Sequence, residues 1–237
     1  MKKTKIEWCD STLNPVVGCT YGCSFCYAKK LNDRFHFVED FTKPQFFPER
    51  LKQLDEKKPQ IIFMDSMSDI ADWTKEARQA TQKAMLKNPQ HIYLFLTKRV
   101  LDSAYTTPRT GWLGVSVTRA SETDRYEELY DNAEWNRHFV SIEPLLDDIT
   151  ESGIHNFLDM EWVIIGAETG NRKEKVTPKK EWVDKIVAIA KEDEIPVFMK
   201  NSLLSIMGEE NMLREFPKSF ENQREKEGER KCIKTRN

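Results

Sequence analysis

Short apolar runs alternate with longer helical stretches along most of the chain, and this alternation restricts the fold more than any other feature. The runs are rich in β-branched and aromatic residues, which is typical of βαβ units and a parallel sheet. Because the middle runs are almost continuously apolar, we expect helices on one face and packed side chains on the other. The sequence therefore predicts an α/β fold, a partial (β/α) barrel of about six or seven parallel strands. The predicted strands are 14–18, 60–65, 91–97, 112–118, 138–143, 162–168 and 195–200.

Three helices are predicted between these runs. One has its apolar face at residues spaced three and four apart, beginning at Trp73, and ends before Pro89. Another begins with Thr177 as N-cap and Pro178 in its first turn. A third is predicted over 121–135.

No repeat, linker or low-complexity segment divides the chain. Its 237 residues suit one TIM-like partial barrel. We expect the barrel to occupy residues 1–200 and a C-terminal helical extension with a charged tail to occupy 201–237. The last part, 224–237, is dense in charge and nearly without apolar residues, which predicts a solvated tail or a short surface helix.

Three cysteines lie within eight residues, at Cys19, Cys23 and Cys26. Three thiolates on one loop can hold three corners of an iron–sulfur cluster or three positions around zinc. The loop supplies no fourth ligand, and an open position is typical of a site that binds and activates something. An odd total of five cysteines, three of them clustered, indicates a metal site rather than a disulfide framework.

Charge and hydropathy exclude several classes of protein. The formal net charge of −2 gives no general basic field for nucleic acid, although a local patch is still open. The longest apolar runs, 61–64 and 162–167, are far shorter than a membrane span, and the first ten residues lack the apolar stretch of a signal peptide. We therefore expect a cytoplasmic protein with no membrane partner.

Polar or charged residues follow each apolar run at its C-terminal end. In a parallel barrel these positions share one rim, which carries the active site in such folds. Many of them only cap a helix or solvate a loop. Glu143 and Glu168 differ because each follows an apolar run, where a partly buried charge needs a cation, hydrogen bonds or a ligand. The rim residues are Asp65, Ser66, Thr97, Lys98, Arg99, Ser116, Thr118, Glu143, Glu168, Thr169, Lys200 and Asn201.

The spacing Cys19-x3-Cys23-x2-Cys26, flanked by Phe25 and Tyr27, resembles the signature of radical S-adenosylmethionine (radical SAM) enzymes. The resemblance implies a [4Fe-4S] cluster held by the three thiolates, with its fourth iron binding the amino and carboxylate groups of S-adenosylmethionine. It also implies cofactor contacts: near the adenine, at the methionine amino group and at the ribose or carboxylate. These contacts fall on Phe25, Tyr27, Asp65, Ser66, Ser68, Ser116, Thr118, Gly166 and Glu168.

Further segments are similar to those of a phage-associated, functionally undefined branch of this superfamily. They span about 8–200 and include the motifs WLGVS at 112–116, SIEPLL at 141–146 and WVIIGAETG at 162–170. The resemblance implies reductive cleavage of S-adenosylmethionine, with an electron from a flavodoxin- or ferredoxin-like donor, and hydrogen abstraction from a substrate that it does not name. Catalytic or substrate-positioning roles are expected for Glu143, Glu168 and Lys98, with Arg99 or Arg119 as other sites for a carboxylate or phosphate.

Two other classes remain open. A zinc site, with Cys9 or His36 as fourth ligand, would make the chain a structural or interaction protein. A nucleic-acid or other macromolecular substrate fits a phage-associated enzyme, yet the cations after Arg224 alternate with glutamates, so their surplus is small. Cys232, in the same tail, is predicted to be a spare thiol.

Overall fold

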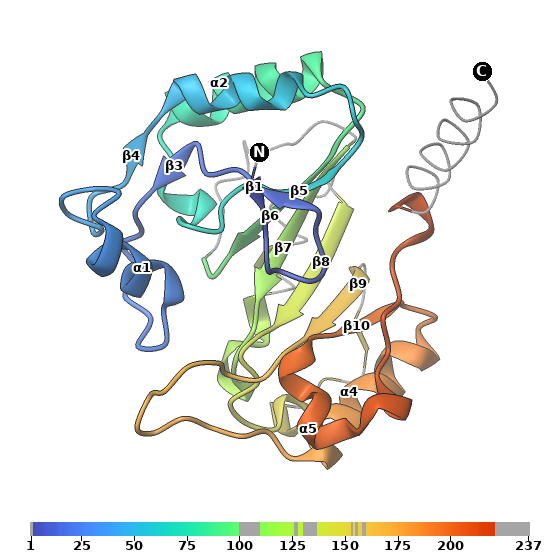
Figure 1. Cartoon of the computed structure of the whole chain (residues 1–237). Coiled ribbons are helices and arrows are strands. Elements are labelled where there is room, and N and C mark those ends of the chain that lie inside the picture. The colour runs from blue at the N-terminus through green and yellow to red at the C-terminus, as the bar shows by residue number, and fades with distance from the viewer. Residues whose placement is uncertain are drawn as a thin grey trace.

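The computed structural model describes residues 2–99, 110–125, 128–129, 137–152, 154, 156–157 and 160–220. Within these ranges the main sheet has eight strands in the order β1-β2-β5-β6-β7-β8-β9-β10. Seven of them, β2 and β5 to β10, run parallel, while β1 is antiparallel to β2. The sheet curls into a half-barrel (Figure 1). Its strands are β1 (Lys2–Lys3), β2 (Ser11–Thr12), β5 (Ile61–Phe63), β6 (Ile92–Thr97), β7 (Gly111–Ser116), β8 (Arg137–Ile142), β9 (Met160–Ile165) and β10 (Val197–Met199).

The predicted α/β class and parallel strands are confirmed, with six of the predicted runs matching β5 to β10. A strand does form within the first predicted run, 14–18, but its predicted place in the parallel sheet is wrong. The strand that joins the main sheet is β2, at Ser11–Thr12, whereas β3 (Val16–Val17) pairs antiparallel with β4 (Gln45–Phe46) in a separate two-stranded sheet. Pro15 cannot donate to a strand ladder, so the extended chain is divided there between two sheets.

Two layers of side chains lie on the two faces of the sheet, because successive residues of a strand point to opposite faces. Ile62, Phe95 and Val115 share a buried cluster with Ala77 of α2 (Lys75–Lys87) and Ile186 of α4 (Lys180–Glu192). These helices therefore cover the outer face of the half-barrel, as expected for this fold. The remaining helices are α1 (Tyr27–Phe35), α5 (Leu204–Met207) and the 3₁₀ helices η1 (Pro48–Asp55), η2 (Ile70–Asp72), η3 (Ala120–Glu122), η4 (Ile149–Ser152), η5 (Asn201–Leu203) and η6 (Glu209–Asn211).

The inner face is covered by both ends of the described chain. A second cluster joins Phe139 of β8 and Trp162 of β9 to Trp8, near the N-terminus, and to Phe216 and Phe220. The ring centroid of Trp162 lies 6.3 Å from that of Trp8 and 5.3 Å from that of Phe220. Apolar side chains thus fill the hollow of the half-barrel at the level of these rings.

The structure confirms one of the three predicted helices, corrects the start of another and describes only part of the third. The helix after Trp73 is confirmed as α2, which Thr74 caps by accepting a hydrogen bond from the backbone N–H of Ala77. The predicted N-cap at Thr177 is wrong, because α4 begins at Lys180 with Lys179 as its N-cap residue. Of the predicted helix over 121–135, residues 126–127 and 130–135 lie outside the described residues.

The segment after β10 continues through η5, α5 and η6 and then returns to the sheet, where the backbone N–H of Met199 donates to Leu213 O at 2.9 Å. Residues 221–237, with the whole of the predicted tail over 224–237 and Cys232, lie outside the described residues. The division of the chain at residue 200 stays a prediction. None of the described helices has the length and apolarity needed to cross a bilayer.

Asp148 fixes the start of η4 and is expected to make the fold sensitive to acid. Its nearly buried carboxylate accepts hydrogen bonds from Thr150 Oγ1 at 2.6 Å and Lys185 Nζ at 2.6 Å. Burial alone would raise its pKa, but these bonds outweigh burial and lower the pKa. The stabilisation is therefore present above the carboxyl's ordinary pKa and is lost as pH falls through the lowered value. We expect Asp148→Ala to cost about 2 kcal/mol of unfolding free energy at pH 7, measured by urea denaturation.

The matched control is Asp184→Ala, which removes an exposed ion pair with Lys180 on α4. Such surface pairs contribute about 0.3–0.5 kcal/mol. The loss caused by Asp148→Ala should shrink as the pH is lowered toward 3, since the wild type then loses the same contacts. Equal losses from the two variants at pH 7 would contradict the assignment.

Candidate metal and cofactor site

The cysteine loop, residues 19–26, begins at a sharp turn after β3. Gly18 has a φ of +117°, in the region that favours glycine. A Cβ at this position would lie 2.8 Å from Pro44 Cα and 2.9 Å from Phe41 O. The backbone N–H of Cys19 donates to Phe41 O at 2.8 Å, and that of Gly18 to Met67 O at 3.0 Å. Glycine is required here, and the turn sets where the loop leaves the small sheet.

Cys19, Cys23 and Cys26 are free, half-buried thiols. Cys26 is the N-cap of α1, and its Sγ accepts a hydrogen bond from the backbone N–H of Lys29 at 3.3 Å. Burial raises the pKa of Cys19 to about 12 and also raises the pKa of Cys23. In the part of the chain that the structure describes, no group of three or more Cys, His, Asp or Glu is arranged to hold a metal ion. A metal would have to displace the thiol protons and draw the sulfurs together.

The donors available fit a cluster held by three thiolates better than a closed zinc site, which needs a fourth ligand. Cys9 packs in the inner-face cluster, whereas Cys19 and Cys26 pack in a different one. His36 lies at the opposite end of α1, whose nine residues place it about 14 Å from Cys26. Neither predicted fourth ligand therefore joins the three thiols.

The cysteine loop lies against the segment that follows the carboxyl end of β5. Gly18 forms a β-bridge with Ser68, and the hydroxyl of Tyr27 donates to Ser66 O at 2.6 Å. Asn14 supports this segment, because its Oδ1 accepts from Ser66 Oγ at 3.0 Å and from the backbone N–H of Met67 at 2.9 Å. The structure thus brings the three cysteines, Tyr27, Ser66 and Ser68 together. Phe25, within the same loop, is half-buried.

A row of polar residues continues the inner face beyond the ends of the strands. The alternation within β7 places Ser116 on this side. Extending the alternation of β5, β8 and β10 by one or two residues places Asp65, Glu143 and Lys200 there as well. Glu143 and Lys200 form an ion pair that bridges β9. Gly166 lies between them, since a Cβ there would be 3.1 Å from both Glu143 Cγ and Lys200 Cδ. Gly166 therefore leaves room for a charged pair at the predicted rim.

Two buried aspartates join the ends of β5 and β6. The Asp65 carboxylate accepts from the backbone N–H of Leu96 at 3.1 Å, and burial raises its pKa well above the ordinary range. Asp69 caps η2 and accepts from Thr97 Oγ1 at 2.8 Å and the backbone N–H of Lys98 at 3.0 Å. Both carboxylates therefore fix the backbone at the end of β6, which carries Lys98. The Lys98 ammonium has no ion-pair partner within the described ranges, and its charge acts to lower the pKa of Cys23, against the larger effect of burial.

Other predicted residues have local partners of their own. Thr118 donates to Glu122 from both its backbone N–H and its hydroxyl, at 2.7 and 2.8 Å. Glu168 receives two hydrogen bonds from Arg172, at 2.7 and 2.8 Å, and these bonds lower its pKa. Arg119 pairs with Asp147 at 3.5 Å. The structure thus gives Thr118 and Glu168 structural contacts and leaves their predicted cofactor roles as predictions.

Several contacts of the site, and one of its residues, are not predicted by the sequence. Lys200 was recognised as a strand-end residue, but its ion pair with Glu143 was not expected. Arg99 was predicted to hold a carboxylate or phosphate, and it is instead paired with Asp72 at 2.6 Å. Arg125, whose Nη2 donates to Tyr21 Oη at 2.6 Å, carried no sequence signal.

A family model described as "Protein of unknown function (DUF5131)" matches residues 3–228. Searches of curated proteins and of solved structures found no match.

Proposed function

The chain belongs to the DUF5131 family, and we propose that it is a radical SAM enzyme that binds a [4Fe-4S] cluster through Cys19, Cys23 and Cys26. The observation that carries the proposal is the place of these thiols. All three lie on one short loop next to the carboxyl end of a strand in a parallel half-barrel, and none is in a disulfide. Active sites of parallel α/β barrels lie at this end of the strands.

When held by Cys19, Cys23 and Cys26, such a cluster would supply the one electron needed for the reductive cleavage of S-adenosylmethionine to methionine and a hydrogen-abstracting 5′-deoxyadenosyl radical. The residues of the chain have to bind, orient and shield these groups. In the proposal, the ammonium of Lys98, which has no ion-pair partner among the described residues, attracts a carboxylate. The Glu143–Lys200 pair at the inner rim offers an acceptor for ribose hydroxyls and a cation for a second anionic group.

The inner face below this rim supports the proposal in a second way. Phe63, Phe139 and Trp162 form a fully packed apolar floor under Asp65 and Glu143. Such buried rings would keep water from the reacting atoms on that side and would strengthen the charges placed above them. The sheet is not closed into a full barrel, and we propose a macromolecule of the nucleic-acid class as the first substrate to test. A cytoplasmic location and a flavodoxin- or ferredoxin-like electron donor belong to the same proposal.

Anaerobic reconstitution with iron and sulfide tests the function directly. We expect about four iron and four sulfide per chain, with broad visible absorption. Addition of dithionite and S-adenosylmethionine should then release 5′-deoxyadenosine and methionine, measured by liquid chromatography with mass spectrometry. A colourless protein that takes up one zinc instead would overturn the proposal.

The substrate class is tested separately, by the binding of single-stranded oligonucleotides to the reconstituted protein. If nucleic acid is the substrate, the affinity should fall steeply between 50 and 200 mM salt, about tenfold or more if only a few phosphates are contacted. An affinity that does not depend on salt would contradict this class and leave the cofactor chemistry untouched.

A further inference from the structure

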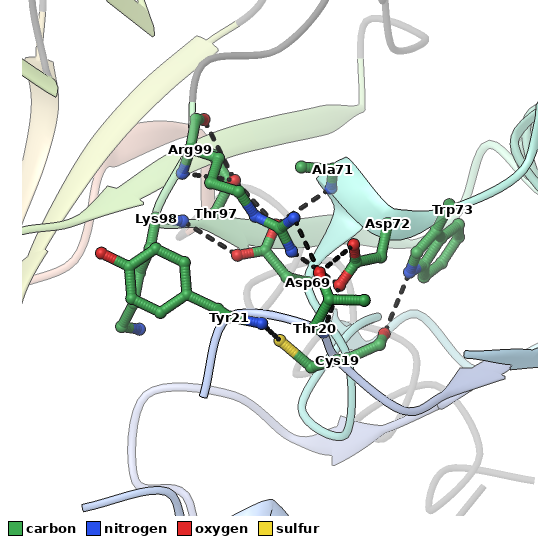
Figure 2. A network of polar contacts seen from close by, with 11 residues as sticks. Cys19, Thr20, Tyr21, Asp69, Ala71, Asp72, Trp73, Thr97, Lys98 and Arg99 are labelled. Atoms are coloured by element: carbon green, nitrogen blue, oxygen red, sulfur yellow. Dashed lines mark hydrogen bonds and ion pairs between the residues drawn. The ribbon is translucent and has the colours of Figure 1, made fainter. Parts of the chain in front are cut away.

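The residue after Cys19 closes a network of charged hydrogen bonds with two segments of the barrel (Figure 2). Thr20 donates to Asp72 from its backbone N–H and its hydroxyl, both at 2.8 Å. Arg99 Nη1 donates to the same hydroxyl at 3.0 Å, and Arg99 Nη2 forms an ion pair with Asp72 at 2.6 Å. One loop residue is thus bound by an acid from η2 and a base that follows β6.

The next loop residue, Tyr21, is bound from a third segment. Arg125 donates to its hydroxyl at 2.6 Å, and Arg125 is itself anchored by hydrogen bonds to Ser116 O at 2.9 Å and Glu122 at 2.8 Å. The guanidinium carbons of Arg99 and Arg125 lie 5.8 and 5.7 Å from the centroid of the Tyr21 ring. Both residues after Cys19 are therefore tied to the ends of β6 and β7.

The two charged partners of Thr20 are partly shielded from water, while Thr20 itself is exposed. The side chain of Asp72 is only 9 % exposed and that of Arg99 is 30 % exposed. The backbone N–H of Arg99 donates to Thr97 Oγ1 at 3.0 Å, and Asp69 holds the same hydroxyl. A partly buried pair with several charge-assisted bonds stabilises its geometry more than an exposed pair does.

We propose that Asp72, Arg99 and Arg125 are positioning residues, which hold residues 20 and 21 of the cysteine loop at the ends of β6 and β7 before any metal binds. The contacts that hold residues 20 and 21 are present in the metal-free chain. Their consequence for a cluster rests on the proposed function: a loop segment that is already held loses less conformational entropy when a cluster binds, and the surroundings of the metal are fixed.

Hydrogen exchange of the metal-free protein tests the hold. We expect Arg99→Ala to raise the exchange rates of the Thr20 and Tyr21 amides about tenfold or more, with β7 and β8 unchanged. Thr20→Val is a milder second variant, since it removes only an exposed hydroxyl, and it should raise the same rates. The control is Arg137→Ala, which removes an Arg–Glu pair of 2.9 Å with Glu161, on β8 and β9. Wild-type exchange rates at positions 20 and 21 in both Arg99→Ala and Thr20→Val would overturn the proposal.

A second measurement separates positioning from general structure. In the reconstituted protein, Arg99→Ala should shift the reduction potential and the electron paramagnetic resonance spectrum of the cluster, while Arg137→Ala should leave both unchanged. Arg99→Lys keeps the charge but not the planar fork that reaches Thr20 and Asp72 together, so it should restore only part of the wild-type behaviour. If the wild type takes up no iron, the proposed function fails. The hydrogen-exchange result still decides whether Asp72, Arg99 and Arg125 hold residues 20 and 21. An unchanged potential and spectrum in Arg99→Ala would contradict the proposed consequence for the cluster.

Discussion

Replacing Cys23 with alanine is expected to abolish the incorporation of iron and, with it, the release of 5′-deoxyadenosine. Cys23 is the middle ligand of the three in the proposed site and its thiol is half-buried. Two remaining thiolates leave a cubane cluster with two unliganded irons, and such a cluster does not persist in water. We expect the iron content after anaerobic reconstitution to fall about tenfold or more, with loss of the broad visible absorption.

Cys9→Ala is the matched control, since it removes a thiol that the proposal does not use. Cys9 is buried in the inner-face cluster, and burial raises its pKa to about 12. Cys9 lies in a different apolar cluster from Cys19 and Cys26, where a buried thiol acts as a small apolar residue. The variant should load iron as the wild type does. Full iron loading of Cys23→Ala, or an equal loss in both variants, would contradict the ligand assignment.

The parallel strands could be predicted because their residues are apolar on both faces. In β6 and β9 nearly every residue is buried, so a continuous apolar run marks the strand whatever its neighbours are. The strand β2 could not be found in this way. It has two residues, Ser11 and Thr12, and it is placed by pairing with β5 about 50 positions later in the chain. No periodicity exists in two residues.

The rim of the half-barrel could be predicted as a set of positions but not as a set of contacts. Glu143 was singled out because a carboxylate after an apolar run needs a partner, and Lys200 is that partner. The pair depends on β8 and β10 lying on either side of β9, and on Gly166 leaving space between them. These are properties of the sheet order, which a local pattern does not contain.

The contacts that hold the cysteine loop are even harder to predict from a local sequence pattern. Thr20 lies 52 positions before Asp72, and Asp72 lies 27 positions before Arg99. Each is an ordinary polar residue in its own segment. The spacing of the cysteines indicates chemistry directly, because three ligands are close in sequence, whereas the groups that orient them come from separate turns of the fold.

Trp162→Ala is expected to be the most destabilising substitution outside the proposed metal site. The indole is fully buried at the centre of the inner face, and its Nε1 donates to Glu215 O at 3.0 Å. It contacts Trp8 near one end of the described chain and Phe220 near the other. Truncation removes a large apolar area and leaves a cavity that rigid neighbouring rings cannot fill. We expect a loss of about 3–5 kcal/mol of unfolding free energy, measured by urea denaturation.

Leu86→Ala serves as the control, because Leu86 on α2 is 64 % exposed and its truncation should change stability by no more than about 0.5 kcal/mol. A second readout follows from the position of Trp162 between the two end segments. If these segments are held to the sheet mainly by this ring, the variant should be cut by protease near residues 215–220 at concentrations that leave the wild type intact. A loss below about 1 kcal/mol, with no new cleavage, would show that the end segments are not part of the core that supports the rim.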